Sequence, residues 1–259
     1  MNKNKIAIYT AVFGDGYDKI KEPSKKIKGC DFICFTDDAS VHSDVFDVRL
    51  ENRYFSDPTL DARMRKILTH KFLPEYEYVV WIDGSVVIRT EDIEYLIDKY
   101  LKKHDVAIHQ HSLRNCIYDE MLECFYRAKD DPADMLKQII SYIKEGYPPN
   151  NGLAETPIVF RRNLAENTKK INEDWWREIE KHSRRDQLSF DYVIWKNNLD
   201  YYRINANARD NENFFVAHHE GQRENHEINM LKQKITTMEK SKFWKIRGRY
   251  LQLQNFFKK

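Results

Sequence analysis

The stretch Tyr78-Val79-Val80-Trp81-Ile82-Asp83-Gly84-Ser85 gives the first indication of both the fold and the site. Its four consecutive apolar residues, 79–82, predict a strand that is buried on both faces. An acid, a glycine and a serine follow at once, and open α/β sheets bind ligands in crevices where strands end. Because residues 86–88 are apolar again, a solvated turn between two strands is the alternative, and the octet by itself does not separate the two readings.

The length and charge of the chain bound the classes of protein it can belong to. Its 259 residues suit one α/β domain, or one domain with an appendage. With 43 Lys and Arg against 41 Asp and Glu, the net charge of +2 gives no argument for nucleic-acid binding, and no nucleic-acid partner is expected. The four cysteines form no C-x-x-C pair, which favours reduced thiols in a cytosolic protein. No apolar run approaches the roughly 20 residues of a membrane-spanning helix, and no signal-peptide cleavage site is visible.

Two further predicted strands, 5–13 and 31–35, are also followed by acidic residues. The glycines after the first strand do not complete the G-x-G-x-x-G pattern of dinucleotide-binding folds. Carboxylates at such strand ends could bind ribose hydroxyls, or they could cap ordinary turns. The residues that could help to form a pocket for a base and ribose at this edge are Thr10, Asp15 and Asp37.

A helix with three basic positions precedes the Asp83 strand. Asp57 fits its N-cap and Pro58 its first helical position. Arg63, Lys66 and His70 then follow at spacings that place them on one stripe of the helix. They could neutralise the charge that develops on a diphosphate leaving group. The spacing alone favours the alternative, a solvated basic edge.

Two acids later in the chain are candidates for the base that activates an acceptor hydroxyl. Glu155 follows the Pro- and Gly-rich loop 147–152 and could line a substrate site. Ser183 and Asp186 fit an S-x-x-D capping box, in which Asp186 would only cap the next helix. A catalytic carboxylate at the start of that helix is the rival reading, and the two readings are not exclusive.

Histidines gather after two of the predicted strands. One group lies where the strand 106–108 gives way to a helix, and it could bind a metal, a phosphate or an acceptor sugar. That group consists of His109, His111, Arg114 and Tyr118. A second pair, His218 and His219, follows the strand 214–217 and could supply a metal ligand.

The segment 240–259 holds seven Lys and Arg, five aromatic residues and no acids. This composition is typical of a segment that anchors a protein to a membrane surface. The alternatives are a helix that packs on the domain or in a homodimer and, as a weaker option, an RNA-binding segment.

Four groups of residues, taken in order, resemble the motifs of one protein family. They are Arg63-Met64-Arg65-Lys66-Ile67 with His70, Leu73-Pro74, Tyr76, Tyr78 and Trp81-Ile82-Asp83-Gly84; residues 111–120; Gly152-Leu153-Ala154-Glu155; and residues 185–190. Over roughly residues 5–220 the chain resembles the glycosyltransferase-like domain family that includes plant mucilage-related and turgor-regulation proteins and many bacterial polysaccharide-cluster proteins.

The resemblance implies a GT-A-like fold, which is a Rossmann-like α/β domain with a mixed, mostly parallel sheet flanked by helices. We expect this domain at residues 1–222 and a basic, aromatic-rich helical tail at 223–259. The implied activity is transfer of a sugar from a nucleotide-sugar, with a UDP-sugar expected, to a glycan or lipid-linked acceptor. The tail also resembles those of bacterial polysaccharide glycosyltransferases, which implies a cytoplasmic enzyme of surface polysaccharide synthesis at the inner face of the plasma membrane.

In the GT-A class a D-x-D motif usually holds ribose and a Mn²⁺ or Mg²⁺ ion, and Asp83-Gly84-Ser85 stands in its place. Ser85 replaces the second acid, and a hydroxyl is a poorer ligand for a hard dication. Either Asp83 and a histidine such as His218 hold the metal, or Arg63 and Lys66 neutralise the diphosphate without one. The expected donor-binding residues are Thr10, Asp15, Asp37, Arg63, Lys66, Asp83 and Ser85; the expected acceptor-binding residues are His109, His111, Arg114 and Tyr118; the expected catalytic residues are Asp186 and Glu155.

Two other classes of function stay open. A plant relative in the family has been associated with ceramide breakdown, so the histidines could serve a metal-dependent hydrolase of lipid amides. They lack a compact metal signature such as H-E-x-x-H. The chain could also be a scaffold that binds a sugar nucleotide without catalysing transfer.

Overall fold

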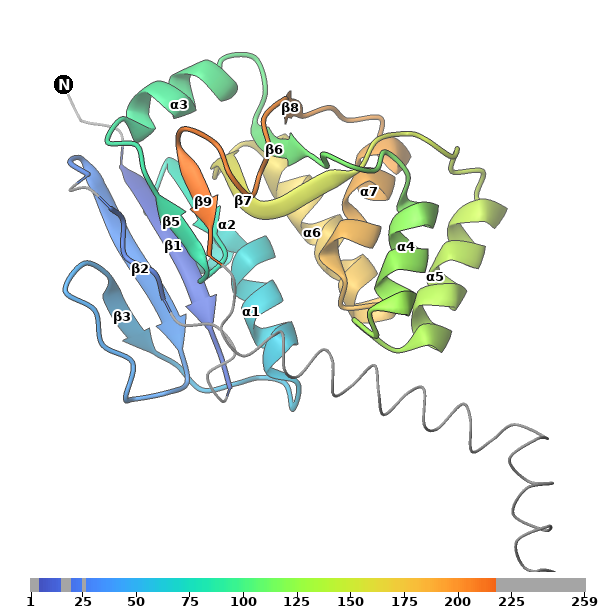
Figure 1. The fold of residues 1–259 in the computed structure, drawn as a ribbon, viewed down its shortest axis with the longest axis horizontal. Helices are drawn as coiled ribbons and strands as arrows, with labels where there is room; N and C mark the ends of the chain where they lie inside the picture. The colour runs from blue at the N-terminus through green and yellow to red at the C-terminus, as the bar shows by residue number, and fades with distance from the viewer. Residues whose placement is uncertain (1–4, 15–19, 25–26, 218–259) are drawn as a thin grey trace, which may run out of the picture. The chain divides into compact units, whose positions relative to one another are not determined.

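A seven-stranded mixed sheet organises the fold (Figure 1). The computed structural model describes residues 5–14, 20–24 and 27–217. The strands follow the order β3-β2-β1-β4-β7-β6-β8, in which β7 runs antiparallel to both of its neighbours and the other adjacent pairs are parallel. Two short strands form a separate antiparallel sheet. The strands are β1 (Ile6–Val12), β2 (Cys30–Thr36), β3 (Asp47–Leu50), β4 (Tyr78–Ile82), β5 (Val86–Ile88), β6 (Val106–Gln110), β7 (Ala154–Arg162), β8 (Tyr202–Ile204) and β9 (Phe214–Val216).

Helices cover the large sheet because alternate residues of its strands point to opposite faces. Tyr9 and Ala11 of β1 face a core formed mainly with α1, α6 and α7, to which α4 and α5 contribute. Ile8 and Val12 face a second core with α3 and the β5–β9 sheet. The helices are α1 (Pro58–Ile67), α2 (Thr69–Phe72), α3 (Ile93–Tyr100), α4 (Ile117–Tyr126), α5 (Pro132–Lys144), α6 (Glu166–Lys181) and α7 (Phe190–Lys196), with a 3-10 turn η1 (Asp186–Leu188).

One edge of the sheet collects several of the predicted site residues. The parallel strands β1, β2, β4 and β6 end at this edge, and the antiparallel strand β7 begins there. The register pairs Ile82 with Ile158 and His109 with Glu155. The acid that follows β4 and the acid at the start of β7 therefore lie along the edge where α/β sheets bind ligands.

The predicted fold class, a mixed and mostly parallel sheet flanked by helices, is confirmed. The start of α1 is confirmed as well, because Asp57 accepts a hydrogen bond from the backbone N–H of Thr59 and Pro58 is the first helical residue. The tail predicted at 223–259 lies outside the described residues. Within the described ranges, no helix has both the length and the apolar character that crossing a bilayer requires.

The capping box predicted from the Ser183–Asp186 spacing is wrong. The Ser183 hydroxyl donates to Asp130, and the Asp186 carboxylate faces Lys66. Helix α7 instead starts after Ser189, without a side-chain cap.

We expect Gly14→Ala to lower the free energy of unfolding by about 2 kcal/mol or more. Gly14 has φ +79°, and an added Cβ would lie 2.8 Å from Cγ of Pro58 at the start of α1. Gly146→Ala is the matched control, since Gly146 has φ +85° but nothing within 4 Å of an added Cβ. Chemical denaturation of both variants measures the difference, and an equal loss in the two would show that the Pro58 contact has no effect.

Candidate functional site

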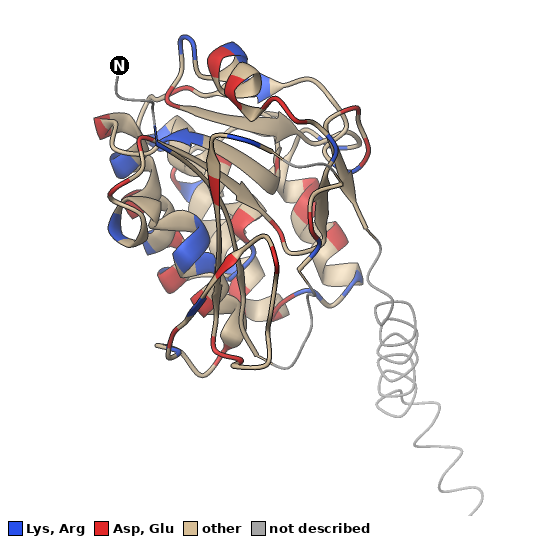
Figure 2. Cartoon of the chain, turned by 90° about the vertical axis from the view of Figure 1, so that its left-hand side faces the viewer, with Lys and Arg blue, Asp and Glu red and all other residues tan. Residues whose placement is uncertain are grey.

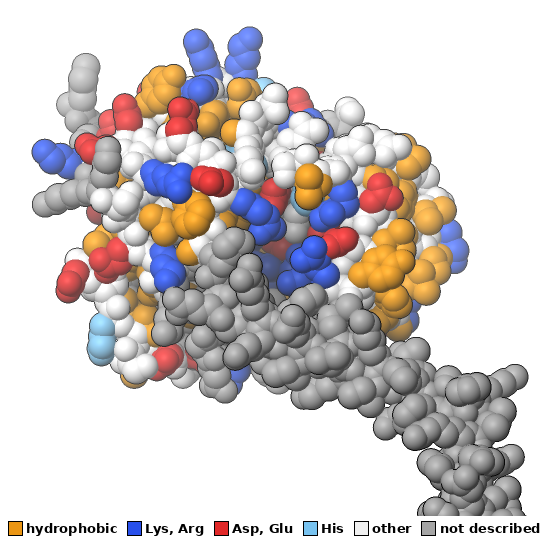
Figure 3. Space-filling view, in the orientation of Figure 1, with side chains coloured by type: hydrophobic (Ala, Val, Ile, Leu, Met, Phe, Trp, Pro, Cys, Tyr) orange, Lys and Arg blue, Asp and Glu red, His pale blue; other side chains and the backbone are white. Residues whose placement is uncertain are grey.

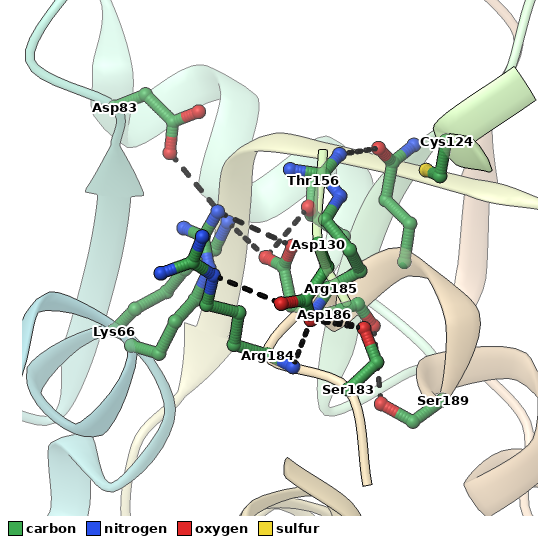
Figure 4. Close-up of polar contacts among 12 residues, drawn as sticks. Lys66, Asp83, Cys124, Asp130, Thr156, Ser183, Arg184, Arg185, Asp186 and Ser189 are labelled. Atoms are coloured by element: carbon green, nitrogen blue, oxygen red, sulfur yellow. Dashed lines mark hydrogen bonds and ion pairs between the residues drawn. The ribbon is translucent and has the colours of Figure 1, made fainter. Parts of the chain in front are cut away.

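A buried ion pair between Lys66 and Asp186 lies at the centre of the candidate site (Figure 4). Lys66 belongs to the last turn of α1, and Asp186 opens the η1 turn before α7. The Lys66 Nζ lies 2.6 Å from Asp186 Oδ2, and the two side chains are 0% and 2% exposed. The solvated basic edge that the helix spacing favoured is therefore wrong for Lys66.

The other two members of the basic stripe, Arg63 and His70, contact different partners. Arg63, one turn before Lys66, places Nη2 3.5 Å from Asp186 Oδ1 and so joins the ion pair. His70 instead contacts Glu173 of α6, 3.1 Å from its Nε2. The stripe thus supplies two cations to the site.

Asp186 is fixed through both its main chain and its carboxylate. Its carbonyl accepts hydrogen bonds from Trp175 Nε1 at 3.0 Å and from the Ser189 hydroxyl at 3.3 Å. Its Oδ2 accepts a hydrogen bond from the Thr156 hydroxyl at 2.9 Å, in addition to the one from Lys66. Helix α6 and strand β7 therefore fix the position of Asp186, and Asp186 in turn binds the Lys66 ammonium.

Asp83 adjoins this pair and is open to solvent. Its Oδ1 accepts a hydrogen bond from Trp81 Nε1 at 2.7 Å and lies 3.5 Å from Lys66 Nζ. The Asp83 side chain is 32% exposed, so a ligand can reach it. The ammonium of Lys66 therefore links a buried carboxylate to an accessible one.

Charge on the described surface is mixed elsewhere and concentrated locally. Figure 2 shows basic and acidic residues interspersed over one side of the chain. Figure 3 shows Lys and Arg side chains gathered around a hollow on another face, with acidic atoms deeper inside it. Positive charge around a hollow is the arrangement that attracts an anionic ligand.

Neighbouring cations keep Asp186 ionised. Burial raises the pKa of Asp186, but Arg63, Lys66 and Arg185 together hold that pKa well below its usual range. Burial lowers the pKa of Lys66, and the carboxylates of Asp186 and Asp83 oppose this shift. A carboxylate with so low a pKa is a weak base, so the geometry favours an electrostatic role for Asp186 over proton transfer.

The free energy of unfolding should fall as the pH drops below about 4. Because the pKa of Asp186 is lowered in the folded state, the Asp186 carboxylate of the unfolded chain is protonated at a higher pH than that of the folded chain. Asp186 therefore contributes stability above its unfolded pKa of about 3.9, and this contribution is lost as the pH falls toward the folded value. Denaturation of wild type and Asp186→Asn at several pH values checks this, because the two stability curves should converge in acid and not run parallel.

Thr10, Ser85 and Asp37 are the other predicted donor residues that the structure describes, and they lie at or near the same sheet edge. Thr10 is buried within β1, and its hydroxyl has no hydrogen-bond partner in the described part of the chain. Ser85 is also buried, and its carbonyl accepts a hydrogen bond from the backbone N–H of Ala217. Asp15 lies outside the described residues.

Asp37 directly follows β2 and contacts the backbone just after β1. Its Oδ1 accepts a hydrogen bond from the backbone N–H of Gly14 at 2.8 Å, and its Oδ2 lies 3.1 Å from Arg53 Nε. The carboxylate is partly exposed and still has room for a further hydrogen bond.

Glu155 is a nearly buried carboxylate at the start of β7. Its Oε1 lies 2.8 Å from Nε of the exposed Arg209, and its own side chain is 2% exposed. The pair is close but not aligned for hydrogen bonding, and neither Glu155 oxygen has a hydrogen-bond donor among the described residues. Buried carboxylate oxygens normally have hydrogen-bond donors, whereas the described partner of this carboxylate is the ion-paired Arg209.

The structure does not place His109 where an acceptor could reach it. The ring is buried and packs perpendicular to the ring of Phe214. Burial lowers the pKa of His109 to about 4, so the imidazole is neutral at pH 7. The prediction that His109 binds an acceptor therefore requires an opening that the described residues do not form.

The other three predicted acceptor residues hold the segment between β6 and α4. Nδ1 of His111 accepts two backbone N–H groups, from the residues two and three positions later. Arg114 Nε donates to Glu120 at 2.8 Å, and the Tyr118 hydroxyl donates to the Tyr147 carbonyl at 2.6 Å. Burial lowers the pKa of His111, while the Glu155 carboxylate nearby raises it, so this segment is electrostatically linked to the start of β7.

The described residues do not by themselves provide a metal site. They contain no group of three or more His, Cys, Asp or Glu side chains that could hold a metal ion. Asp83 has the Lys66 ammonium beside it, and Ser85 is buried. His218, the second predicted ligand, lies outside the described residues. Lys66 lies close to both Asp83 and Asp186, and Arg63 lies close to Asp186.

Sequence reasoning missed three side chains that support the site. Trp81 could have been found, because it stands two residues before Asp83 and so points to the same side of an extended chain. Thr156 stands next to Glu155, but nothing in its spacing indicates a partner 30 residues away. Trp175 is a buried residue of the amphipathic helix α6, and its sequence context does not distinguish it from an ordinary core residue.

The fold and the site define an α/β protein with a cluster of two cations and two carboxylates at the carboxyl edge of its sheet. The family model of the TOD1/MUCI70 glycosyltransferase-like domain matches residues 1–221, and the chain belongs to this family. The family that the sequence motifs predicted is thereby confirmed.

Two known proteins resemble the chain at different levels. The probable hexosyltransferase MUCI70 of Arabidopsis thaliana is 25% identical over 216 residues, which cover 73% of this chain. The chain spans 37% of the length of that curated relative. A crystal structure of a glycosyltransferase involved in the glycosylation of the major capsid of PBCV-1 has a TM-score of 0.44 and 10% identity, covering 88% of this chain and 99% of that one.

Proposed function

We propose that the protein is a glycosyltransferase that uses a nucleotide-sugar donor, whose diphosphate binds beside Asp83, Lys66 and Arg63. The observation that carries the proposal is the Lys66 ammonium, which links the accessible Asp83 to the buried Asp186 at 3.5 and 2.6 Å. This ammonium lies at the sheet edge where α/β folds bind ligands. Membership of a glycosyltransferase-like family and similarity to a probable hexosyltransferase support the proposal.

The proposed reaction uses the two cations to stabilise the leaving group. As the bond from the sugar to the diphosphate breaks, negative charge develops on the diphosphate oxygen. Lys66 and Arg63 stabilise that charge without moving, because Asp186 already holds them in place. Asp83 accepts hydrogen bonds from the donor and keeps the Lys66 ammonium directed toward it.

The acceptor hydroxyl must lose a proton when the new glycosidic bond forms. We assign this proton to Glu155, whose two oxygens have no hydrogen-bond donors among the described residues. The exposed side chain of Arg209, which pairs with this buried carboxylate, would have to move aside to admit the acceptor. Asp186 would accept the proton poorly, because the surrounding cations lower its pKa.

The finer features of the proposal rest on the sequence. They are a UDP-sugar donor, a glycan or lipid-linked acceptor, and a role in bacterial surface polysaccharide synthesis. The basic and aromatic composition of 240–259 supports attachment to the inner face of the plasma membrane, and a homodimer through this tail is the alternative.

A Mn²⁺ or Mg²⁺ ion at Asp83 is the second proposed way to neutralise the diphosphate. When bound, such an ion would supply Lewis-acid stabilisation of the leaving group. Of the two predicted ligands only Asp83 is described, and Lys66 lies 3.5 Å from it. A dication and Lys66 would therefore share the same carboxylate.

Calorimetry with UDP, GDP, CDP and dTDP, each with and without Mn²⁺, tests the proposed function. We expect one of the four to bind, with its affinity unchanged without Mn²⁺ if Lys66 and Arg63 suffice and raised by Mn²⁺ if a dication takes part. Failure of all four to bind a folded protein would contradict the proposal. Release of fatty acid from ceramide without any nucleotide would favour the lipid-amide hydrolase, and binding without sugar transfer would favour the scaffold.

A further inference from the structure

Arg161 of β7 is a buried guanidinium without a counter-ion in the described chain. Its Nη1 donates to the Tyr9 hydroxyl at 3.1 Å, while its Nε and Nη2 have no hydrogen-bond partner there. No described carboxylate lies within ion-pair distance of Arg161, and burial lowers its pKa. An unpaired buried charge lowers the stability of the folded state. We therefore look for a role of Arg161 other than stabilising the core.

The hydroxyl of Tyr9 leads from Arg161 to the site. It donates to the carbonyl of Lys66 at 2.9 Å. That carbonyl belongs to the last turn of α1, where main-chain acceptors lack partners within the helix. A guanidinium can only donate and a tyrosine hydroxyl has a single proton. Arg161 therefore cannot accept the Tyr9 proton, which is donated to the carbonyl of Lys66.

The ring of Trp175 makes a second connection. It lies 5.8 Å from the Arg161 guanidinium, and its Nε1 donates to the carbonyl of Asp186 at 3.0 Å. A third connection runs from Tyr9 to Trp81, with ring centroids 5.2 Å apart, and Trp81 donates to Asp83.

We propose that Arg161 is a positioning residue for the donor site, which through Tyr9 and Trp175 fixes the main chain at Lys66 and at Asp186. The inference rests on the proposed function, since it assigns these contacts a purpose in binding a donor diphosphate. The ammonium must meet carboxylates on two different elements, and a displacement of about 1 Å in such a group is enough to weaken binding and catalysis severely. The buried cluster prevents the end of α1 from making that displacement.

Tyr9→Phe is the central test, because it deletes only the hydroxyl. Calorimetry should show the nucleoside diphosphate that wild type binds best, chosen from UDP, GDP, CDP and dTDP, binding about fivefold or more weakly. The same variant should bind the corresponding nucleoside, which has no phosphate, as wild type does. Tyr142→Phe is the matched control: it is equally buried and donates to Glu178 at 2.7 Å, outside the cluster. We expect it to lose stability without losing diphosphate affinity.

Two Arg161 variants separate positioning from simple stability. Arg161→Lys keeps a cationic donor for Tyr9, whereas Arg161→Met removes it, so lysine should restore part of the affinity that methionine loses. Unchanged diphosphate affinity in Tyr9→Phe would overturn the inference, as would an equal loss in Tyr142→Phe. If Arg161→Met does not fold, Trp175→Phe, which removes the donor to Asp186, provides the second measurement. If wild type binds no nucleoside diphosphate, the result contradicts the proposed function, and with it this inference.

Discussion

Asp83→Asn is expected to reduce sugar transfer by about 100-fold or more, while the free energy of unfolding changes by less than about 1 kcal/mol. The substitution keeps the shape of the side chain and an acceptor for the Trp81 indole, but it removes the charge that holds one side of the Lys66 ammonium. Asp83 is partly exposed, and Lys66 keeps its closer partner Asp186, so the core loses little.

Steady-state kinetics and chemical denaturation on the same samples measure the two quantities. Asp98→Asn on α3 is the matched control, because it neutralises an exposed carboxylate on an element of the second core, away from the Lys66–Asp186 pair. It should leave both quantities at the wild-type value. A large loss of stability in Asp83→Asn would mean that Asp83 is structural, and the site would have to be sought elsewhere.

Lys66→Met should abolish nucleoside diphosphate binding and also lower the free energy of unfolding by about 3 kcal/mol. It leaves the Asp186 carboxylate buried with Arg63 at 3.5 Å and the Thr156 hydroxyl as its remaining side-chain partners there. A buried charge that loses its main partner is strongly destabilising, in contrast to an exposed one. Calorimetry and denaturation measure the two effects.

The double variant Lys66→Met/Asp186→Asn separates the two effects. Removing both charges avoids an isolated buried carboxylate, so part of the stability should return while diphosphate binding stays lost. Lys71→Met is the control on the neighbouring turn, where Lys71 is exposed and pairs with Glu173 at 2.8 Å. It should change stability by less than about 1 kcal/mol. Wild-type diphosphate affinity in Lys66→Met would contradict the proposed role of the ammonium.

The order of the strands along the chain and the place of Asp83 were predictable from local patterns. Apolar runs gave β1, β2 and β4, and an acid directly after a strand is positioned by the strand itself. The Lys66–Asp186 pair was not predictable by spacing, because 120 residues separate the two side chains. Helical periodicity shows which residues share a stripe, but it does not show what packs against that stripe.

Two sequence interpretations, those of Asp186 and His109, depended on which side chains are buried in the folded protein. Ser183 and Asp186 matched a capping box because the pattern is short and occurs easily by chance. In the structure the Asp186 carboxylate accepts hydrogen bonds from β7 and α1 and does not cap a helix. His109 matched a ligand-binding cluster, yet it is the residue of that cluster buried within β6. The pattern of polar residues does not show which side of the strand is covered.

The position of β7 between β4 and β6 has a consequence for synthesis of the chain on the ribosome. β7 begins about 70 residues after β4 ends, which takes about 4 to 14 s at the usual rates of translation. During that interval the inner edge of β4 has no neighbour on one side, and an unpaired apolar strand invites association with other nascent chains. Fragments that stop before residue 162 should therefore aggregate, and chaperones that cover strand edges should matter most in this period.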